Sequence, residues 1–148
     1  RPYLGRKTVE PYSPEELKSA AYESALDGPL VDYTSKGTKV ELEGVEKVEN
    51  HDAYNLKVTM KGGAVQHVWV DAGTFLEVKV EGTPRRMDGK MRAVSIYLRD
   101  YKNVSGVMVP YVIETAVAGN RDTHKILIES VAVNPKLDDS LFAMPKVK

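Results

Sequence analysis

The sequence contains no cysteine, which excludes disulfide frameworks, thiolate zinc sites and cysteine nucleophiles. It has only two phenylalanines and one tryptophan, and no apolar run is long enough to cross a bilayer as a helix. The 21 basic and 21 acidic side chains give a net charge of zero. Nucleic-acid binding normally requires a basic face, so the composition does not support a nucleic-acid partner.

The start of the chain also lacks two features. It begins at Arg1 without a methionine and without a signal peptide, so we read it as a mature product or a piece of a longer protein. Its 148 residues fit one domain spanning positions 1–148, and no internal repeat or linker divides them.

Residues that commonly carry chemistry are scattered. His51, His67 and His124 fall on different expected elements without a carboxylate at ligand spacing, so we expect no metal site and no cofactor. Asp138 and Asp139 are adjacent, which favours turn residues over an acid–base pair. Nucleophile-elbow, Walker A and dinucleotide motifs are missing, so we expect no catalytic residues and no enzymatic activity. A hydrolase whose serine, histidine and acid converge only in the fold is a further alternative.

The clearest pattern runs from residue 52 to 82. Residues 54–60 alternate between apolar and polar, which is the two-residue period of a half-buried strand. Gly62 and Gly63 permit a tight turn, and the almost wholly apolar segment 65–71 returns. A third strand is expected at 75–81. Three consecutive antiparallel strands make a meander.

Outside the meander, the sequence predicts four more strands, one helix and a tail. The strands are expected at 40–48, 91–101, 107–118 and 123–133. A bulge is expected near Gly44, and Pro110 favours an edge or bulged position. Residues 82–89 are expected to form a polar loop. Ser13, Pro14 and Glu16 have the spacing of a helix start with a capping box, and the helix is expected to reach Ala25. The tail, 137–145, is expected to be anchored by Leu141 and Phe142.

These elements predict a mainly β, α+β fold: a curved antiparallel sheet with one N-terminal helix packed on a face. Segments 65–70 and 107–117 carry apolar side chains on both faces, so each face is covered or encloses something. One short helix with small side chains cannot cover about seven strands. Part of the sheet therefore remains for an apolar ligand or a partner chain.

Six different short segments of the sequence together form a pattern that is fairly specific in its order and spacing. They are GPLVDY (28–33), KGTKVELEGVEKV (36–48), DAYNLKV (52–58), WVDAGTFLEVK (69–79), YLRDYKNVSGVMVP (97–110) and VNPKLDDSLFAMP (133–145). In these segments the chain resembles the bacterial periplasmic outer-membrane lipoprotein-sorting proteins, the lipoprotein-carrier superfamily. Asn50 departs from the family, which tends to have glycine there, and family members carry a substantial portion before the point that matches Arg1. The chain thus resembles the C-terminal part of a longer carrier domain.

The resemblance implies an incomplete β-barrel whose hydrophobic interior accepts lipoprotein acyl chains. It implies a periplasmic, non-enzymatic binding or carrier module for lipoprotein acyl chains or other lipids. The expected lipid-binding residues are apolar strand positions: Leu56, Val58, Met60, Trp69, Leu76, Val78, Ile96 and Leu98. The alternative is a structural or protein-interaction domain that uses an unpaired sheet edge or its apolar face to form a homodimer or to bind a partner.

Overall fold

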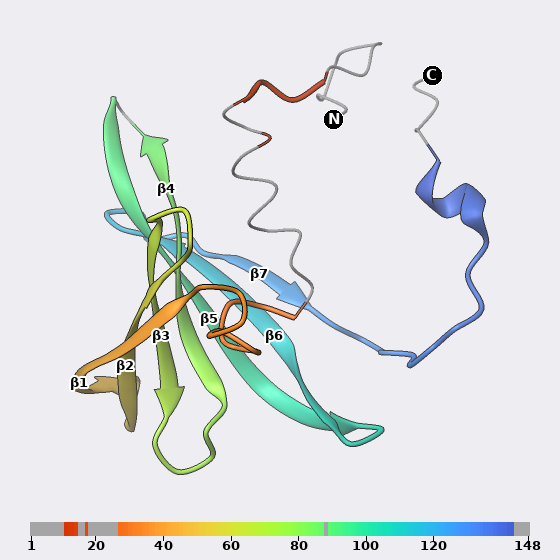
Figure 1. Ribbon diagram of the computed structural model, residues 1–148, viewed down its shortest axis with the longest axis horizontal. Helices are drawn as coiled ribbons and strands as arrows, with labels where there is room; N and C mark the ends of the chain where they lie inside the picture. The colour runs from red at the N-terminus through yellow and green to blue at the C-terminus, as the bar shows by residue number, and fades with distance from the viewer. Residues whose placement is uncertain (1–10, 15–16, 18–26, 88, 144–148) are drawn as a thin grey trace. The chain divides into compact units, whose positions relative to one another are not determined.

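The computed structural model describes residues 11–14, 17, 27–87 and 89–143. The chain divides into two compact units, one formed by Pro29–Val133 and the other by Arg1–Gly28 with Asn134–Lys148. The first unit holds a seven-stranded antiparallel sheet in which neighbours in sequence are neighbours in space (Figure 1). Its strands are β1 (Lys39–Val48), β2 (His51–Thr59), β3 (Val65–Asp71), β4 (Glu77–Met87), β5 (Lys90–Val104), β6 (Val107–Val117) and β7 (His124–Leu127).

Tight turns make this simple order possible. Gly63 takes a φ of 81° between β2 and β3, where the Met60 N–H donates to the Ala64 carbonyl at 2.8 Å. Ser105 and Gly106 both have positive φ between β5 and β6, and the side chain of Asn103 accepts from the Gly106 N–H at 3.0 Å. Such positive values suit two-residue hairpin turns, so each strand returns directly beside the previous one.

The strand register gives the sheet two chemically different faces. Residues opposite each other in an antiparallel pair share a face. One row crosses five strands with aliphatic side chains only, and we call this side the apolar face; the row is Leu42, Leu56, Val68, Val80 and Ile96. The other side, the polar face, carries the row Asn55, Trp69, Lys79, Tyr97, Glu114 and Lys125.

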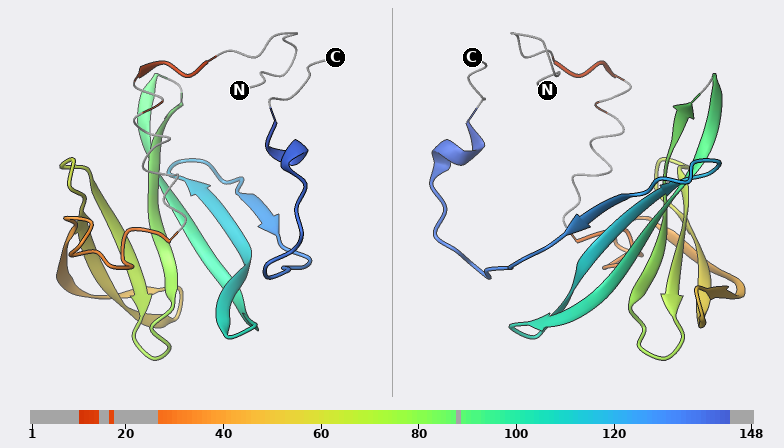
Figure 2. Two further views of the ribbon diagram at one scale, coloured as in Figure 1. Left: turned by 45° about the vertical axis from the view of Figure 1, so that its right-hand side comes forward. Right: turned by 180° about the vertical axis from the view of Figure 1, so that it is seen from behind.

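Buried residues occur on both faces. On the apolar face, Val58 and Val68 have exposed fractions of 0% and 1%. On the polar face, Val48, Ala53 and Trp69 form a buried cluster. The segment between residues 29 and 38 crosses one face of the sheet in each view (Figures 1 and 2). Part of one face of the sheet is therefore covered by this segment, whereas the edges of the sheet are not.

The predicted antiparallel β architecture is confirmed, and so is the irregularity near Gly44, where the register of β1 and β2 shifts between Leu42 and Gly44. Pro110 lies within β6, but β7 pairs only with Val112 to Thr115. The missing N–H of Pro110 therefore faces no neighbouring strand on that side, which is where proline is tolerated.

The largest differences from the predicted strand boundaries are in β4 and β7. Residues 82–87 belong to β4 rather than to a loop, because Arg85 and Met87 pair with the start of β5 despite their polar neighbourhood. Strand β4 begins at Glu77 because Phe75 has a φ of 58°, which is incompatible with an extended strand. Strand β7 has only four residues, so the predicted strand at 123–133 was too long.

The sheet is not closed into a barrel, and β1 and β7 are its two edges. The helix predicted over 13–25 falls mostly outside the described residues. Its described part shows one helical hydrogen bond, from the Leu17 N–H to the Ser13 carbonyl at 2.9 Å. Pro14 and Leu17 are helical, but the elements delimited in the described part of the chain include no α-helix, so the predicted helix packed on a face is not supported.

The tail contains one short 3-10 turn, η1 (Asp139–Phe142), capped by the Asp138 side chain, which accepts from the Ser140 N–H at 2.8 Å. Leu141 and Phe142 are 68% and 75% exposed, so the prediction that they anchor the tail was wrong. A single turn of four residues buries none of its side chains. Within the described ranges, no helix has the length and apolar character needed to cross a membrane.

Candidate functional site

The apolar face is the larger candidate surface. Val70, Val80, Ile96, Leu98 and Ile113 on this face are half-buried. At its margins, Leu42 of β1 is 61% exposed and Ile126 of β7 is 46% exposed. Contiguous apolar surface of this kind is typical of a site that another apolar group covers.

The eight residues predicted from the sequence do not share one surface. Leu56, Val58, Ile96 and Leu98 lie together on the apolar face. Met60 directly follows β2, and continuing the alternation places it on the same side. Trp69 lies on the polar face, and Val78 packs against its buried cluster. Leu76 lies in the turn before β4, where its carbonyl accepts from the Asp71 N–H at 2.9 Å.

Sequence reasoning also missed members of the apolar face. Val70, Val80 and Ile113 belong to it by register but were not among the predicted residues. The alternating pattern of the sequence predicted that Val78 and Val80 lie on the same face. A register shift between Trp69 and Val70 breaks that alternation, which explains why Val78 packs on the opposite side.

A hydrogen-bonded group surrounds Trp69 on the polar face. Its indole Nε1 donates to Oε2 of Glu46 at 2.9 Å, and Nδ2 of Asn55 donates to Oε1 of the same carboxylate at 2.9 Å. The Lys79 ammonium lies 3.8 Å from the centre of the indole ring. The hydrogen bond from Trp69 is the main cause of a lowered pKa of Glu46, and the bond from Asn55 adds to it. Glu46 is thus fixed as a carboxylate.

His67 bridges carboxylates of two other strands. Its Nδ1 lies 2.7 Å from Oε2 of Glu81, and its Nε2 lies 3.2 Å from Oε2 of Glu43. Among the described residues, no group of three or more histidine, aspartate or glutamate side chains is placed to hold a metal ion. We therefore interpret this bridge as a structural tie across the polar face.

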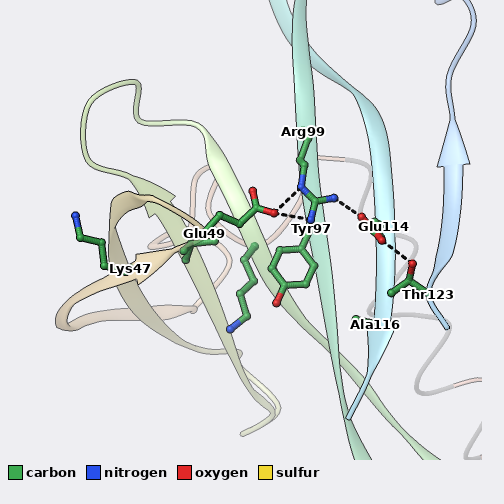
Figure 3. A pocket seen from close by; sticks show the side chains of 9 residues that line it. Lys47, Glu49, Tyr97, Arg99, Glu114, Ala116 and Thr123 are labelled. Carbon is green, nitrogen blue, oxygen red and sulfur yellow. Dashed lines mark hydrogen bonds and ion pairs between the residues drawn. The ribbon is translucent and has the colours of Figure 1, made fainter. Parts of the chain in front are cut away.

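A pocket of about 330 Å³ also opens on the polar face. Figure 3 shows Arg99 at its centre, between Glu49 and Glu114. Arg99 donates to Oε1 of Glu49 from Nε at 3.0 Å and from Nη2 at 2.8 Å, and its Nη1 donates to Glu114. Thr123 donates to the second oxygen of Glu114. The other lining residues are Lys47, Val48, Lys79, Tyr97 and Ala116.

The electrostatics of this pocket favour ion binding over proton transfer. Hydrogen bonds from Arg99 to Glu49, and then to Glu114, raise the pKa of Arg99. The pKa of Glu114 is lowered, first by the hydrogen bond from Thr123 and next by the one from Arg99. These groups stay charged near neutral pH, where a general acid or base would have to change its protonation state.

No protein-family model and no curated protein matches the sequence. Among solved structures, a LolA superfamily protein from Nitrosomonas europaea is similar, with a TM-score of 0.50 and 21% identity over 72% of this chain. A DUF1329 family protein from Desulfovibrio piger is similar with a TM-score of 0.57 and 17% identity over 88% of this chain. This chain has a LolA-like fold. The resemblance seen in the sequence is therefore confirmed at the level of the fold.

The chain spans only 49% of the LolA superfamily protein and 57% of the DUF1329 family protein. The match thus extends over about half of each of these two larger structures. At these identities the likeness concerns the fold alone.

Proposed function

We propose that this chain binds acyl chains of lipoproteins or other lipids on the apolar face of its sheet, as a non-enzymatic carrier or binding module of the bacterial periplasm. The observation that carries the proposal is the aliphatic row Leu42, Leu56, Val68, Val80 and Ile96, which crosses five strands of a LolA-like sheet. In this reading the larger carrier domain, of which the chain is the C-terminal part, supplies the remaining cover.

Burial of apolar surface alone is strong enough for this role. Each buried methylene contributes about 0.8 kcal/mol, so roughly ten methylenes contribute about 8 kcal/mol before the costs of ordering and association. The open face offers half-buried Leu56, Ile96 and Leu98 for such contacts. Binding needs no catalytic group, cofactor or metal.

A fluorescent fatty acid titrated into the delipidated chain tests the proposal. Ile126 and Leu127 provide a matched pair, because they are neighbours on β7 that are 46% and 66% exposed and lie on opposite faces by register. Ile126→Asn should weaken acyl-chain binding several-fold, whereas Leu127→Asn, on the polar face, should leave it unchanged. Leu98→Asn, nearer the middle of the sheet, should weaken it by more than ten-fold.

Two results would contradict acyl-chain binding on this face. One is the absence of saturable binding in a chain that carries the full N-terminal portion of the domain, and the other is an equal effect of Ile126→Asn and Leu127→Asn. Sedimentation of the unliganded chain distinguishes acyl-chain binding from the alternative of a protein-interaction domain. If the chain forms a dimer and Ile126→Asn dissociates it, a second copy of the chain, rather than a lipid, covers the apolar face.

A further inference from the structure

The pocket around Arg99 serves no purpose in acyl-chain binding, because it opens on the polar face. Glu49 belongs to the turn between β1 and β2, yet its carboxylate reaches Arg99 on β5, with β2, β3 and β4 lying between these strands in the sheet order. The β1–β2 hairpin must therefore fold across the polar face at this end. Its tip brings the carboxylate to a guanidinium 50 residues later in the chain.

The two carboxylates that flank Arg99 are held very differently. The Glu114 side chain is 16% exposed, projects from a strand inside the sheet and accepts hydrogen bonds from both Arg99 and Thr123. The Glu49 side chain is 50% exposed and lies on a turn, and its interactions within the described part of the chain are those with Arg99. Glu49 is thus the carboxylate whose displacement from Arg99 requires less free energy.

The geometry points to an oxyanion-binding site at Arg99, in which Glu49 is a built-in occupant that the carboxylate or phosphate group of a small ligand displaces. One oxygen of Glu49 accepts from both Nε and Nη2 of Arg99. This side of a guanidinium binds carboxylates and phosphates alike, through two parallel N–H donors. A ligand oxyanion would take the same two donors.

The rest of the pocket suits a small anion. Once Glu49 has left, the lining carries the cations Lys79 and Arg99 against the single carboxylate of Glu114, whereas Lys47 is paired with Asp52 at 2.8 Å. Tyr97 adds a ring beside the site, with the guanidinium carbon of Arg99 5.0 Å from its centre. A volume of about 330 Å³ accommodates a small organic anion but not a macromolecule.

Displacement of Glu49 sets the affinity. A tethered carboxylate competes with a free ligand at an effective concentration of the order of millimolar. The unmodified chain should therefore bind free oxyanions weakly, and removal of the Glu49 charge should strengthen that binding. Departure of Glu49 should also loosen the β1–β2 hairpin. Because Val48, next to Glu49, packs in the cluster of Trp69, the fluorescence of the only tryptophan should report the change.

Calorimetric titration with inorganic phosphate and with succinate, at constant ionic strength, tests the site. Glu49→Gln should bind at least one of these ions ten-fold or more tightly than the unmodified chain. Glu129→Gln is the matched control, because it makes the same change in net charge at an exposed position outside the pocket, and it should behave as the unmodified chain does. Tighter binding of phosphate alone assigns a phosphate ligand, and tighter binding of succinate alone assigns a carboxylate ligand.

A second substitution tests the role of Arg99. Adding Arg99→Lys to Glu49→Gln keeps the charge but removes the paired donors, and should abolish the gain while circular dichroism confirms the fold. If that double variant does not fold, Lys79→Gln in the Glu49→Gln background should reduce the gain. No gain in Glu49→Gln, or an equal gain in Glu129→Gln, would overturn the site. Neither result affects acyl-chain binding on the opposite face, which the fatty-acid titration measures separately.

Discussion

The indole of Trp69 on β3 and the carboxylate of Glu46 on β1 are joined by a hydrogen bond of 2.9 Å that passes over β2. Asn55, on the intervening strand, donates to the other oxygen of Glu46 at 2.9 Å. One carboxylate therefore ties three strands together on the polar face. Trp69 is buried, and its ring packs with Val48 and Ala53.

We predict that this tie makes the stability of the sheet depend on pH. The pKa of Glu46 is lowered in the folded chain, mainly by the hydrogen bond from Trp69. A carboxyl group whose folded pKa lies below its unfolded value stabilises the fold above the unfolded pKa, and this contribution is lost as pH falls through the folded pKa. Urea unfolding followed by tryptophan fluorescence should show stability declining below about pH 4.5, the ordinary value for glutamate.

Glu46→Gln should remove part of that decline. Other carboxylates with lowered pKa values, such as Asp71 and Glu114, still titrate in the variant, so the informative quantity is the difference between the two proteins at each pH. This difference should be largest near neutral pH and should shrink in acid. A difference that is the same at pH 3 and pH 7 would exclude a contribution from the ionisation of Glu46.

Gly82 and Val94 should be energetically coupled. They lie opposite each other in β4 and β5, and a Cβ at position 82 would lie only 2.8 Å from Cγ1 of Val94. Gly82→Ala should therefore destabilise the chain by about 1–3 kcal/mol, the usual range for an overpacked site. Gly73→Ala is the matched control: its new Cβ would meet its nearest neighbour at an ordinary 3.5 Å, so it should change stability by less than about 0.5 kcal/mol.

A double-mutant cycle measures this coupling by urea unfolding. Val94→Ala removes the methyl group that the new Cβ would strike. The double variant should therefore lose less stability than the two single variants combined, by roughly 1 kcal/mol. Strict additivity would show that the strand relaxes around the added methyl group and that contact with Val94 does not limit this position.

The sequence predicts well what depends on local patterns. Alternation in residues 54–60 and the turn at Gly63 are local, and the structure confirms both. The division of the candidate residues between faces depends instead on register. A one-residue irregularity between β3 and β4 separates Val78 from Val80, and nothing in the two identical side chains signals it.

Polar pairs between residues far apart in the chain were even harder to predict from the sequence. Glu49 and Arg99 meet because a hairpin tip folds across the sheet, and neither residue belongs to a motif. Likewise, Trp69 was assigned to the lipid-binding set as an apolar strand position, whereas its indole is held on the polar face by a hydrogen bond to Glu46, 23 residues earlier. Charge and apolar character can be counted in a sequence, but the face on which they appear is a property of the assembled sheet.

Glu77 should destabilise the fold at neutral pH. Burial raises the pKa of this carboxyl group. A carboxyl group with a raised folded pKa favours the fold while it is protonated, and that contribution is lost as pH rises from the unfolded pKa through the folded one. Glu77→Gln should therefore raise the urea midpoint at pH 7 and have little effect below about pH 4. A fall in the midpoint at pH 7 would show that the charged form is compensated in the folded chain.

Tyr101 should ionise unusually late. Its hydroxyl donates to the Glu77 carbonyl at 2.7 Å, and burial, with the nearby charge of Glu77 adding to it, raises its pKa to about 12. An acid with a raised folded pKa stabilises the fold below its unfolded pKa of about 10 and ceases to do so as pH rises through about 12. Tyr101→Phe should cost about 1 kcal/mol at neutral pH, where the hydrogen bond is lost.

Absorbance titration distinguishes this ionisation from those of the other seven tyrosines among the eight in the chain. The difference between the unmodified chain and Tyr101→Phe isolates one phenol, and its midpoint should lie near 12 rather than near 10. Glu77→Gln should shift that midpoint downward, because a neutral amide no longer opposes the phenolate, while the larger effect of burial remains. A midpoint near 10 in the difference titration would place the hydroxyl in solvent and contradict its hydrogen bond to the start of β4.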